Sequence, residues 1–217
     1  MSLTAIRRHI KTIVLAALLF TGGTACPRTA ADFFAEAPVE VLPLLDRTTR
    51  LDMLDYFAHG LETASRNVLD GHSRITAQSD NKIDIQISRD ARLQLAVFTL
   101  KADTLLVAIE TVLTPVADSD IRIYRSDWTP LASRPRMPEA ADFVPADRKR
   151  DAKRSTMPEP LFIKAEFDPE TALFTFFNAT GDYYTENDRP DGLGLMSDSI
   201  TMAFDGRRFV EPKAKKK

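Results

Sequence analysis

The sequence predicts an α+β protein in which N-terminal helices pack on antiparallel β-sheet. Three observations predict this class. Before residue 62, apolar residues recur at spacings of three and four, as they do on one face of a helix. From residue 73 onward they alternate with polar residues, which is the period of a half-buried strand. Asp205-Gly206 separates two alternating runs and is a strong hairpin signal.

Two helices are predicted from these spacings. Residues 30–38 form a short helix that ends at a proline. Residues 46–61 form a longer helix, in which Thr48 or Thr49 caps the first turn. Its buried stripe is expected to comprise Leu51, Leu54, Phe57, Ala58 and Leu61.

The β region is predicted to contain strands at residues 82–87, 92–97, 104–113, 121–128, 161–167, 172–177, 200–204 and 207–210. Residues 104–113 are apolar at both odd and even positions, so we expect a central strand that is covered on both faces. The runs 93–129 and 161–207 have the same order of strands and turns. We therefore hypothesise two similar β-meanders.

Composition divides the chain into five stretches. These are residues 1–25, a signal peptide; 30–131, the helices and first β-meander; 132–160, a loop rich in proline and charge; 161–210, the second β-meander; and 211–217, a lysine-rich tail. The hydrophobic fraction of 44% and charged fraction of 28% are typical of a globular protein. A chain of 217 residues is long enough for one domain or for two small halves that share a core.

The N-terminus has the pattern of a secretory signal. Arg7, Arg8 and Lys11 precede the uncharged run 12–20, and small residues follow it. That run is about half of the ~20 apolar residues that a membrane-spanning helix needs. We therefore expect an exported protein with no transmembrane helix in the mature chain.

Cys26 is the only cysteine and a candidate lipidation site. Gly23 stands three residues before it, where a lipoprotein signal normally has a leucine-like residue. Ordinary signal peptidase cleavage after Ala25 suits these residues at least as well, and residues 29–31 offer a later site that discards the cysteine. A lipid anchor is therefore the less favoured interpretation. With no cysteine after Cys26, the exported chain has no internal disulfide.

The charge balance argues against nucleic acid as a partner. Removing residues 1–25 takes away three of the 29 basic residues and none of the 31 acidic ones, which leaves a net charge of −5. Four of the remaining basic residues lie in the lysine-rich tail, so the folded body is more acidic still. An acidic surface is a poor match for a phosphate backbone.

Two groups of acidic residues are candidate metal ligands. Asp52, Asp55 and His59 lie along one side of the second predicted helix, although a solvated face opposite the apolar stripe is the simpler interpretation. Asp182, Asp188 and Asp191 share a glycine-bearing loop, but their spacing differs from that of an EF-hand.

The alternative to a calcium site in this loop is a polar hairpin loop with aromatic anchors. Exposed aromatic side chains suit contact with a protein or a sugar. We therefore consider Tyr183, Tyr184 and Trp128 a candidate contact surface.

The sequence gives no support for nucleophilic catalysis, and we predict no cofactor. It has no Gly-x-Ser-x-Gly elbow and no glycine-rich phosphate loop, and only two histidines follow the signal. Whether the protein is an enzyme is left open, with a non-enzymatic binding module favoured over a hydrolase or other metal-dependent enzyme.

The chain resembles an uncharacterised exported protein family of Bacteroidales, domain-of-unknown-function family 3256. The motifs that carry the resemblance are Arg50-Leu-Asp-Met-Leu-Asp-Tyr-Phe57, Ser79-Asp-Asn81, Asp103-Thr-Leu-Leu106 and the run 118–131, which contains Asp127-Trp128. The resemblance extends over about residues 30–204. It implies an envelope-associated or secreted protein, in the periplasm or outer envelope of a Gram-negative bacterium. The partner that we expect for a binding module is an unidentified protein or glycan of the envelope. The resemblance implies no activity and no catalytic residue.

Overall fold

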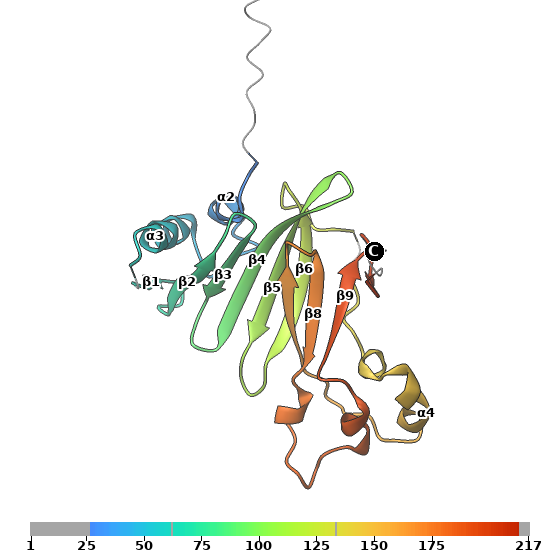
Figure 1. Cartoon of the computed structure of the whole chain (residues 1–217). Coiled ribbons are helices and arrows are strands. Elements are labelled where there is room, and N and C mark those ends of the chain that lie inside the picture. The colour runs from blue at the N-terminus through green and yellow to red at the C-terminus, as the bar shows by residue number, and fades with distance from the viewer. Residues whose placement is uncertain (1–26, 62, 133, 213–217) are drawn as a thin grey trace, which may run out of the picture.

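The computed structural model describes residues 27–61, 63–132 and 134–212 (Figure 1). Within them, two antiparallel sheets each follow chain order. The six-stranded sheet comprises β1 (Ser65–Arg66), β2 (His72–Gln78), β3 (Lys82–Gln86), β4 (Ala91–Leu100), β5 (Asp103–Val112) and β6 (Asp118–Arg125). The four-stranded sheet comprises β7 (Ile163–Asp168), β8 (Leu173–Asn178), β9 (Ser199–Phe204) and β10 (Phe209–Val210). The predicted α+β class with antiparallel sheet is confirmed.

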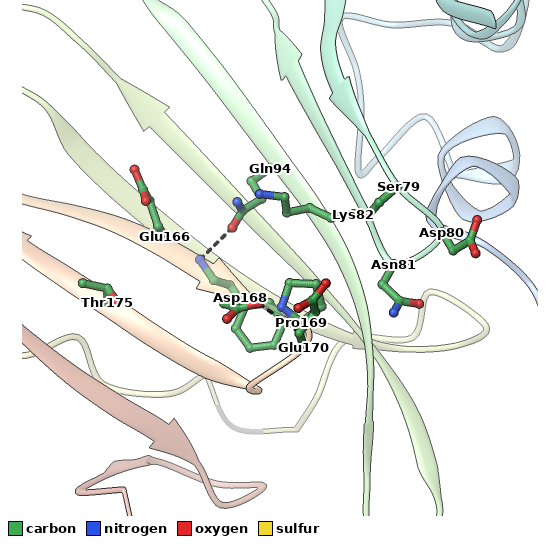
Figure 2. Close-up of a pocket in the computed structure, with 11 residues that line it drawn as sticks. Ser79, Asp80, Asn81, Lys82, Gln94, Glu166, Asp168, Pro169, Glu170 and Thr175 are labelled. Atoms are coloured by element: carbon green, nitrogen blue, oxygen red, sulfur yellow. Dashed lines mark hydrogen bonds between the residues drawn. The ribbon is translucent and has the colours of Figure 1, made fainter.

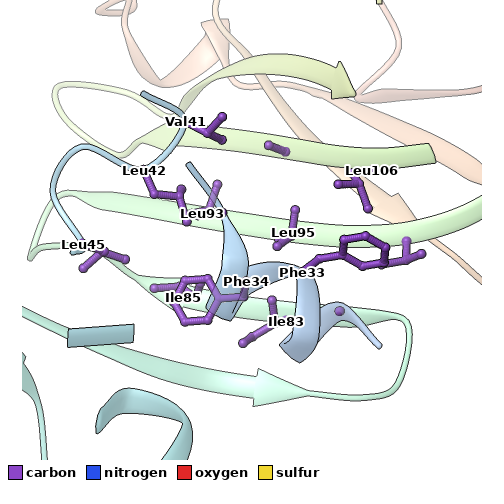
Figure 3. Close-up of a cluster of buried hydrophobic side chains, with 14 of the residues drawn as sticks. Phe33, Phe34, Val41, Leu42, Leu45, Ile83, Ile85, Leu93, Leu95 and Leu106 are labelled. Atoms are coloured by element: carbon purple, nitrogen blue, oxygen red, sulfur yellow. The ribbon is translucent and has the colours of Figure 1, made fainter. Parts of the chain in front are cut away.

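The N-terminal helices cover one face of the six-stranded sheet (Figure 1). In α2 (Ala30–Glu36), Thr29 caps the first turn and exchanges hydrogen bonds with Asp32. Phe33 and Phe34 of α2 are buried against β3 and β4, as Figure 3 shows. The connector to α3 (Arg47–Ala58) adds Val41, Leu42 and Leu45 to this core.

The long helix differs from its prediction in two ways. Its cap is Asp46, whose carboxylate accepts the N–H of Thr49, so neither predicted threonine caps it. Its buried residues are Arg50 and Met53, with Leu54 and Phe57 partly buried. Leu51, Ala58 and Leu61 of the predicted stripe are exposed. The buried face of the helix is thus centred on Arg50 and Met53, and the predicted stripe lies at its side.

Arg50 reaches this core because its guanidinium group has backbone partners there. The group donates to the carbonyls of Leu45 at 3.0 Å and Ala35 at 3.4 Å. The second carbonyl belongs to the last turn of α2, where a positive charge offsets the helix dipole. One side chain therefore joins α2, the connector and α3.

The second sheet packs on the opposite face of the six-stranded sheet, over β4, β5 and β6. Central strand β5 is buried on both faces, as predicted: Leu106 and Ala108 face the helices, and Leu105 and Val107 face the second sheet. The hairpin predicted at Asp205-Gly206 is also present, with Gly206 in the left-handed region at φ +104°.

Three side chains link the two sheets by accepting N–H groups from β7. Asp118 accepts from Ile163 at 3.1 Å, Ser119 from Ala165 at 2.9 Å, and Gln94 from Phe167 at 2.7 Å. We call Asp118, Ser119 and Gln94 the bridging side chains. They place β7 beside the six-stranded sheet without adding it to that sheet.

The predicted loop 132–160 contains short helical pieces. The first is the 3-10 helix η1 (Ala140–Phe143). A second 3-10 turn, η2 (Ala146–Arg148), leads into α4 (Lys149–Ala152), which the sequence analysis missed because one helical turn is too short for a periodic pattern. The turns η3 (Thr180–Asp182) and η4 (Asp191–Leu195) lie between β8 and β9.

The predicted signal peptide, Cys26 and the last five residues of the predicted lysine-rich tail lie outside the described residues. Within the described part of the chain, no helix is both long enough and apolar enough to cross a membrane.

Candidate functional site

A polar groove lies between the uncovered face of β3 and β4 and the strand β7. Two adjoining hollows form it, of about 570 and about 330 Å³. Lys82, Gln94 and Glu166 line both hollows, so the two share part of their lining. We call this feature the inter-sheet groove.

The groove begins where the second sheet stops covering β4. The even-numbered residues of β4 all face that side. Arg92 and Gln94 line the groove, whereas Ala96 and Phe98 are buried beneath the second sheet. One strand therefore supplies both the floor of the groove and part of the core that fixes its wall.

Hydrogen bonds and ion pairs hold the groove side chains in place, and Figure 2 shows the hydrogen bond that Gln94 makes to β7. Asp84 accepts from the Gln94 amide at 3.2 Å and pairs with Lys82 at 3.2 Å. The other end of the Gln94 amide accepts the N–H of Phe167 in β7. On the wall, Lys164 pairs with Glu166 at 2.7 Å. The amide of Gln94 therefore ties the floor to the wall.

Asp168 lies at the end of the groove formed by the β7–β8 turn. Its carboxylate accepts hydrogen bonds from the Thr171 hydroxyl at 2.7 Å and the Glu170 N–H at 3.0 Å. These two hydrogen bonds, the first above all, hold the pKa of Asp168 below its ordinary value. Asp168 is thus charged at neutral pH, and with Asp80 and Glu170 it makes this end acidic.

The inter-sheet groove offers both donors and acceptors to a polar ligand. Lysine, arginine and glutamine side chains can donate, and the carboxylates and hydroxyls can accept. The described lining residues include neither histidine nor cysteine.

Sequence analysis did not identify this site. The polar residues of β3 and β4 alternate with buried ones, which is also the pattern of a solvated sheet face. The useful signal was the change within β4 from alternation to the continuous apolar run 95–98, which marks where the second sheet begins to cover the strand.

The predicted metal ligands of α3 lie on its solvent-exposed side. His59 Nδ1 is 3.3 Å from a carboxylate oxygen of Asp55 and 2.9 Å from the Asp55 backbone carbonyl oxygen. Asp52 is exposed one turn earlier. In the acidic loop, Asp188 accepts from the Thr185 hydroxyl. The described residues contain no cluster of three or more His, Cys, Asp or Glu side chains that could hold a metal ion. The metal hypotheses stay predictions.

The three predicted contact aromatics lie in different surroundings. Tyr183 is 46% exposed and packs on Phe162 at 5.0 Å between ring centroids. The hydroxyl of Tyr184 donates to the Glu159 carbonyl at 2.8 Å, so that side chain anchors its loop. Trp128 is 8% exposed and packs against Tyr124 beneath the helices. Of the three, Tyr183 is the one that is exposed, and the contact surface stays a prediction.

The fold and groove define a three-layer protein: helices, a six-stranded antiparallel sheet, and a smaller antiparallel sheet with a polar groove beside it. The chain belongs to the family described as protein of unknown function (DUF3256), whose model matches residues 25–209. This confirms the family resemblance seen in the sequence.

Among solved structures, the chain is similar to one described as the structure of a domain of an uncharacterized protein from Porphyromonas gingivalis W83. The TM-score is 0.64 with 21% sequence identity, and the match covers 82% of this chain and 96% of that chain. At this identity the likeness shows the fold alone. Comparison with curated proteins finds no match.

Proposed function

We propose that this protein is an exported, envelope-associated binding module that holds a polar ligand, either a protein segment or a glycan, in the inter-sheet groove. The observation that carries the proposal is the groove itself. Its floor and its wall come from different sheets, and both present hydrogen-bonding side chains in fixed positions. Prearranged polar groups reduce the entropy cost of binding.

Binding without chemistry is the proposed role because two of the groove carboxylates are already paired with neighbouring side chains. Asp84 is held by Lys82 and Gln94, and Glu166 by Lys164. The lowered pKa of Asp168 keeps it ionised at neutral pH, whereas a general acid must hold a proton there.

The export part of the proposal is supported by the N-terminal residues. A basic segment, a short apolar run and small residues precede Cys26. We propose the periplasm or outer envelope of a Gram-negative bacterium as the location, with a lipid on Cys26 as the less favoured form.

Photo-cross-linking in the native envelope tests the binding role. A photoreactive amino acid replaces Asn81 or Glu166 in the groove, and a control carries it at Arg125, which is exposed on β6. We expect a discrete adduct from both groove positions and none from the control. Mass spectrometry and carbohydrate staining then tell a protein from a glycan.

A groove variant completes the experiment. Gln94→Ala removes the amide that ties floor to wall, so the adduct at Asn81 should fall about tenfold, as expected when partly buried hydrogen bonds that hold the groove are lost. Equal adducts from the groove and the control, or no adduct from any position, would refute the proposal.

A further inference from the structure

Five basic residues lie in α4 or directly beside it in the chain. α4 is at the other end of the molecule from α2 (Figure 1). We call Arg148, Lys149, Arg150, Lys153 and Arg154 the basic segment. All five are exposed. Only two acidic residues, Asp147 and Asp151, are interspersed among them, so the segment is positive although the exported chain as a whole is acidic.

The basic segment differs from the other arginines of the same loop in its pairing. Arg134 forms an ion pair with Asp120, and Arg136 pairs with Glu139 and with Asp142 at 3.2 Å. These partners raise the pKa of Arg136, with the Glu139 hydrogen bond contributing most. By contrast, the five side chains of the basic segment make no ion pair with any residue that the structure describes.

The segment is also firmly anchored at both ends. Before it, Phe143 is buried, and its carbonyl accepts the N–H of Ser197 at 2.8 Å. After it, the carbonyl of Thr156 accepts the N–H of Gly192 at 3.0 Å. This contact is close: a Cβ on Gly192 would lie 2.7 Å from the carbonyl oxygen of Thr156. The basic side chains therefore project from a fixed turn, unlike those of a frayed chain end.

We propose that the basic segment docks the protein on a membrane surface rich in anionic phospholipid. Its residues lie on and beside α4, whose backbone projects from the sheets in Figure 1, and none of them lines the inter-sheet groove. A flat array of phosphates can meet such a convex surface, whereas an extended polyanion is usually held in a positive groove. Three of the five residues are arginines, which bind phosphate with two hydrogen bonds.

The acidic body favours one orientation on such a surface. Regions with net negative charge are repelled by anionic lipid, so the basic segment is the part that approaches. Ala152 of α4 packs on the core between the two sheets, whereas Phe33 and Phe34 of α2 belong to the core on the opposite face of the six-stranded sheet. Docking through α4 thus leaves the helix layer away from the membrane. This proposal does not depend on the one for the inter-sheet groove.

Vesicle sedimentation of the full-length chain tests the proposal. The probes are phosphatidylcholine vesicles with and without phosphatidylglycerol, at low salt. One variant carries Arg148→Gln, Lys149→Gln, Arg150→Gln, Lys153→Gln and Arg154→Gln. A control with the same change in charge carries Arg47→Gln, Arg89→Gln, Lys101→Gln, Arg125→Gln and Arg207→Gln, all at exposed positions. The wild-type chain and both variants have the same N-terminal segment, so any difference in their vesicle binding is caused by the substituted residues.

We expect the wild-type chain and the control to prefer anionic vesicles, and the basic-segment variant to bind them at least about tenfold more weakly. Salt at about 1 M, where the Debye length is about 3 Å, should abolish the preference. Thermal melting checks that both variants are folded. Equal losses in the two variants, or no preference for anionic vesicles, would overturn the proposal. So would retention on an immobilised anionic polysaccharide without vesicle binding.

Discussion

The two faces of the six-stranded sheet are covered in different ways. On the helix side, the core is mainly aliphatic, with Phe33 and Phe34 packed on isoleucine and leucine side chains. On the other side, the core is also mainly aliphatic, but its phenylalanine rings pack against one another, and Phe174 lies 4.4 Å from Phe167 and 4.9 Å from Phe209 between centroids. Phe33 and Phe34 are thus packed among branched side chains, whereas several rings on the sheet side contact other rings.

The side-chain hydrogen bonds that hold the helix layer differ from those that hold the second sheet. Arg50 holds the helix layer together by donating to two backbone carbonyls. The bridging side chains hold the second sheet by accepting three backbone N–H groups. Arg50 thus ties the elements of the helix layer to one another, whereas the three bridging side chains tie one sheet to the other.

The largest expected effect is loss of a core ring on the sheet side. Phe174 is fully buried, so Phe174→Ala should lower the free energy of unfolding by about 3–5 kcal/mol, as measured by urea denaturation. Phe34→Ala is the matched change on the helix side, because Phe34 is also fully buried. Both variants should unfold in one transition. A separate early transition in Phe34→Ala would show that the helix layer is not part of one cooperative unit.

Arg50→Ala should have the next largest effect. It removes both the donors to two carbonyls and the packing of a long stem, so we expect a loss of about 2–4 kcal/mol by the same measurement. Arg50→Met restores the packing alone and should recover part of this loss. Full recovery by methionine would contradict a polar role for Arg50.

Removing one bridging side chain should cost less, because two others stay in place. Ser119→Ala leaves the N–H of Ala165 without its acceptor and should lower the free energy of unfolding by about 1–2 kcal/mol. Thr99→Ala, at an exposed position of β4, is the control and should change stability by less than about 0.5 kcal/mol. Equal effects of the two substitutions would show that the bridge does not hold the sheet interface.

The smallest effect is expected at the cap of α2 and depends on pH. Hydrogen bonds from Thr29, chiefly its backbone N–H, lower the pKa of Asp32. The stabilisation by the carboxylate is therefore complete above the ordinary pKa and is lost as pH falls through the lowered pKa. At neutral pH, Asp32→Asn should cost less than about 1 kcal/mol, because the pair is exposed. In thermal melts, the difference in stability between the wild type and Asp32→Asn should disappear below about pH 4. A difference that persists in acid would contradict the cap assignment.

Sequence patterns predicted the elements whose signals are local. The apolar run of β5 and the Asp205-Gly206 turn each specify their structure within a few residues. The prediction of the buried face of α3 was wrong in part. An arginine with an apolar stem occupies a core position, whereas the periodicity of the sequence assigns the core to leucine. Trp128 could not be placed because its left-handed turn, at φ +66°, directs the indole into the core.

The inter-sheet groove depends on contacts that local patterns do not contain. Gln94 and its partner Phe167 are 73 residues apart in the chain, and the long loop lies between them. Whether the uncovered positions of β3 and β4 face open solvent or a wall is decided by where the second sheet docks. That docking depends on the combined shape of two cores.

The bridging side chains have a consequence for how the molecule meets its neighbours. An edge strand can pair with a strand of another molecule through its free N–H groups, and such pairing commonly leads to aggregation. β7 is an edge strand of its sheet, but three of its N–H groups already donate hydrogen bonds to side chains of the same chain. The link that positions the groove wall therefore also protects the folded protein from adding a foreign strand at that edge.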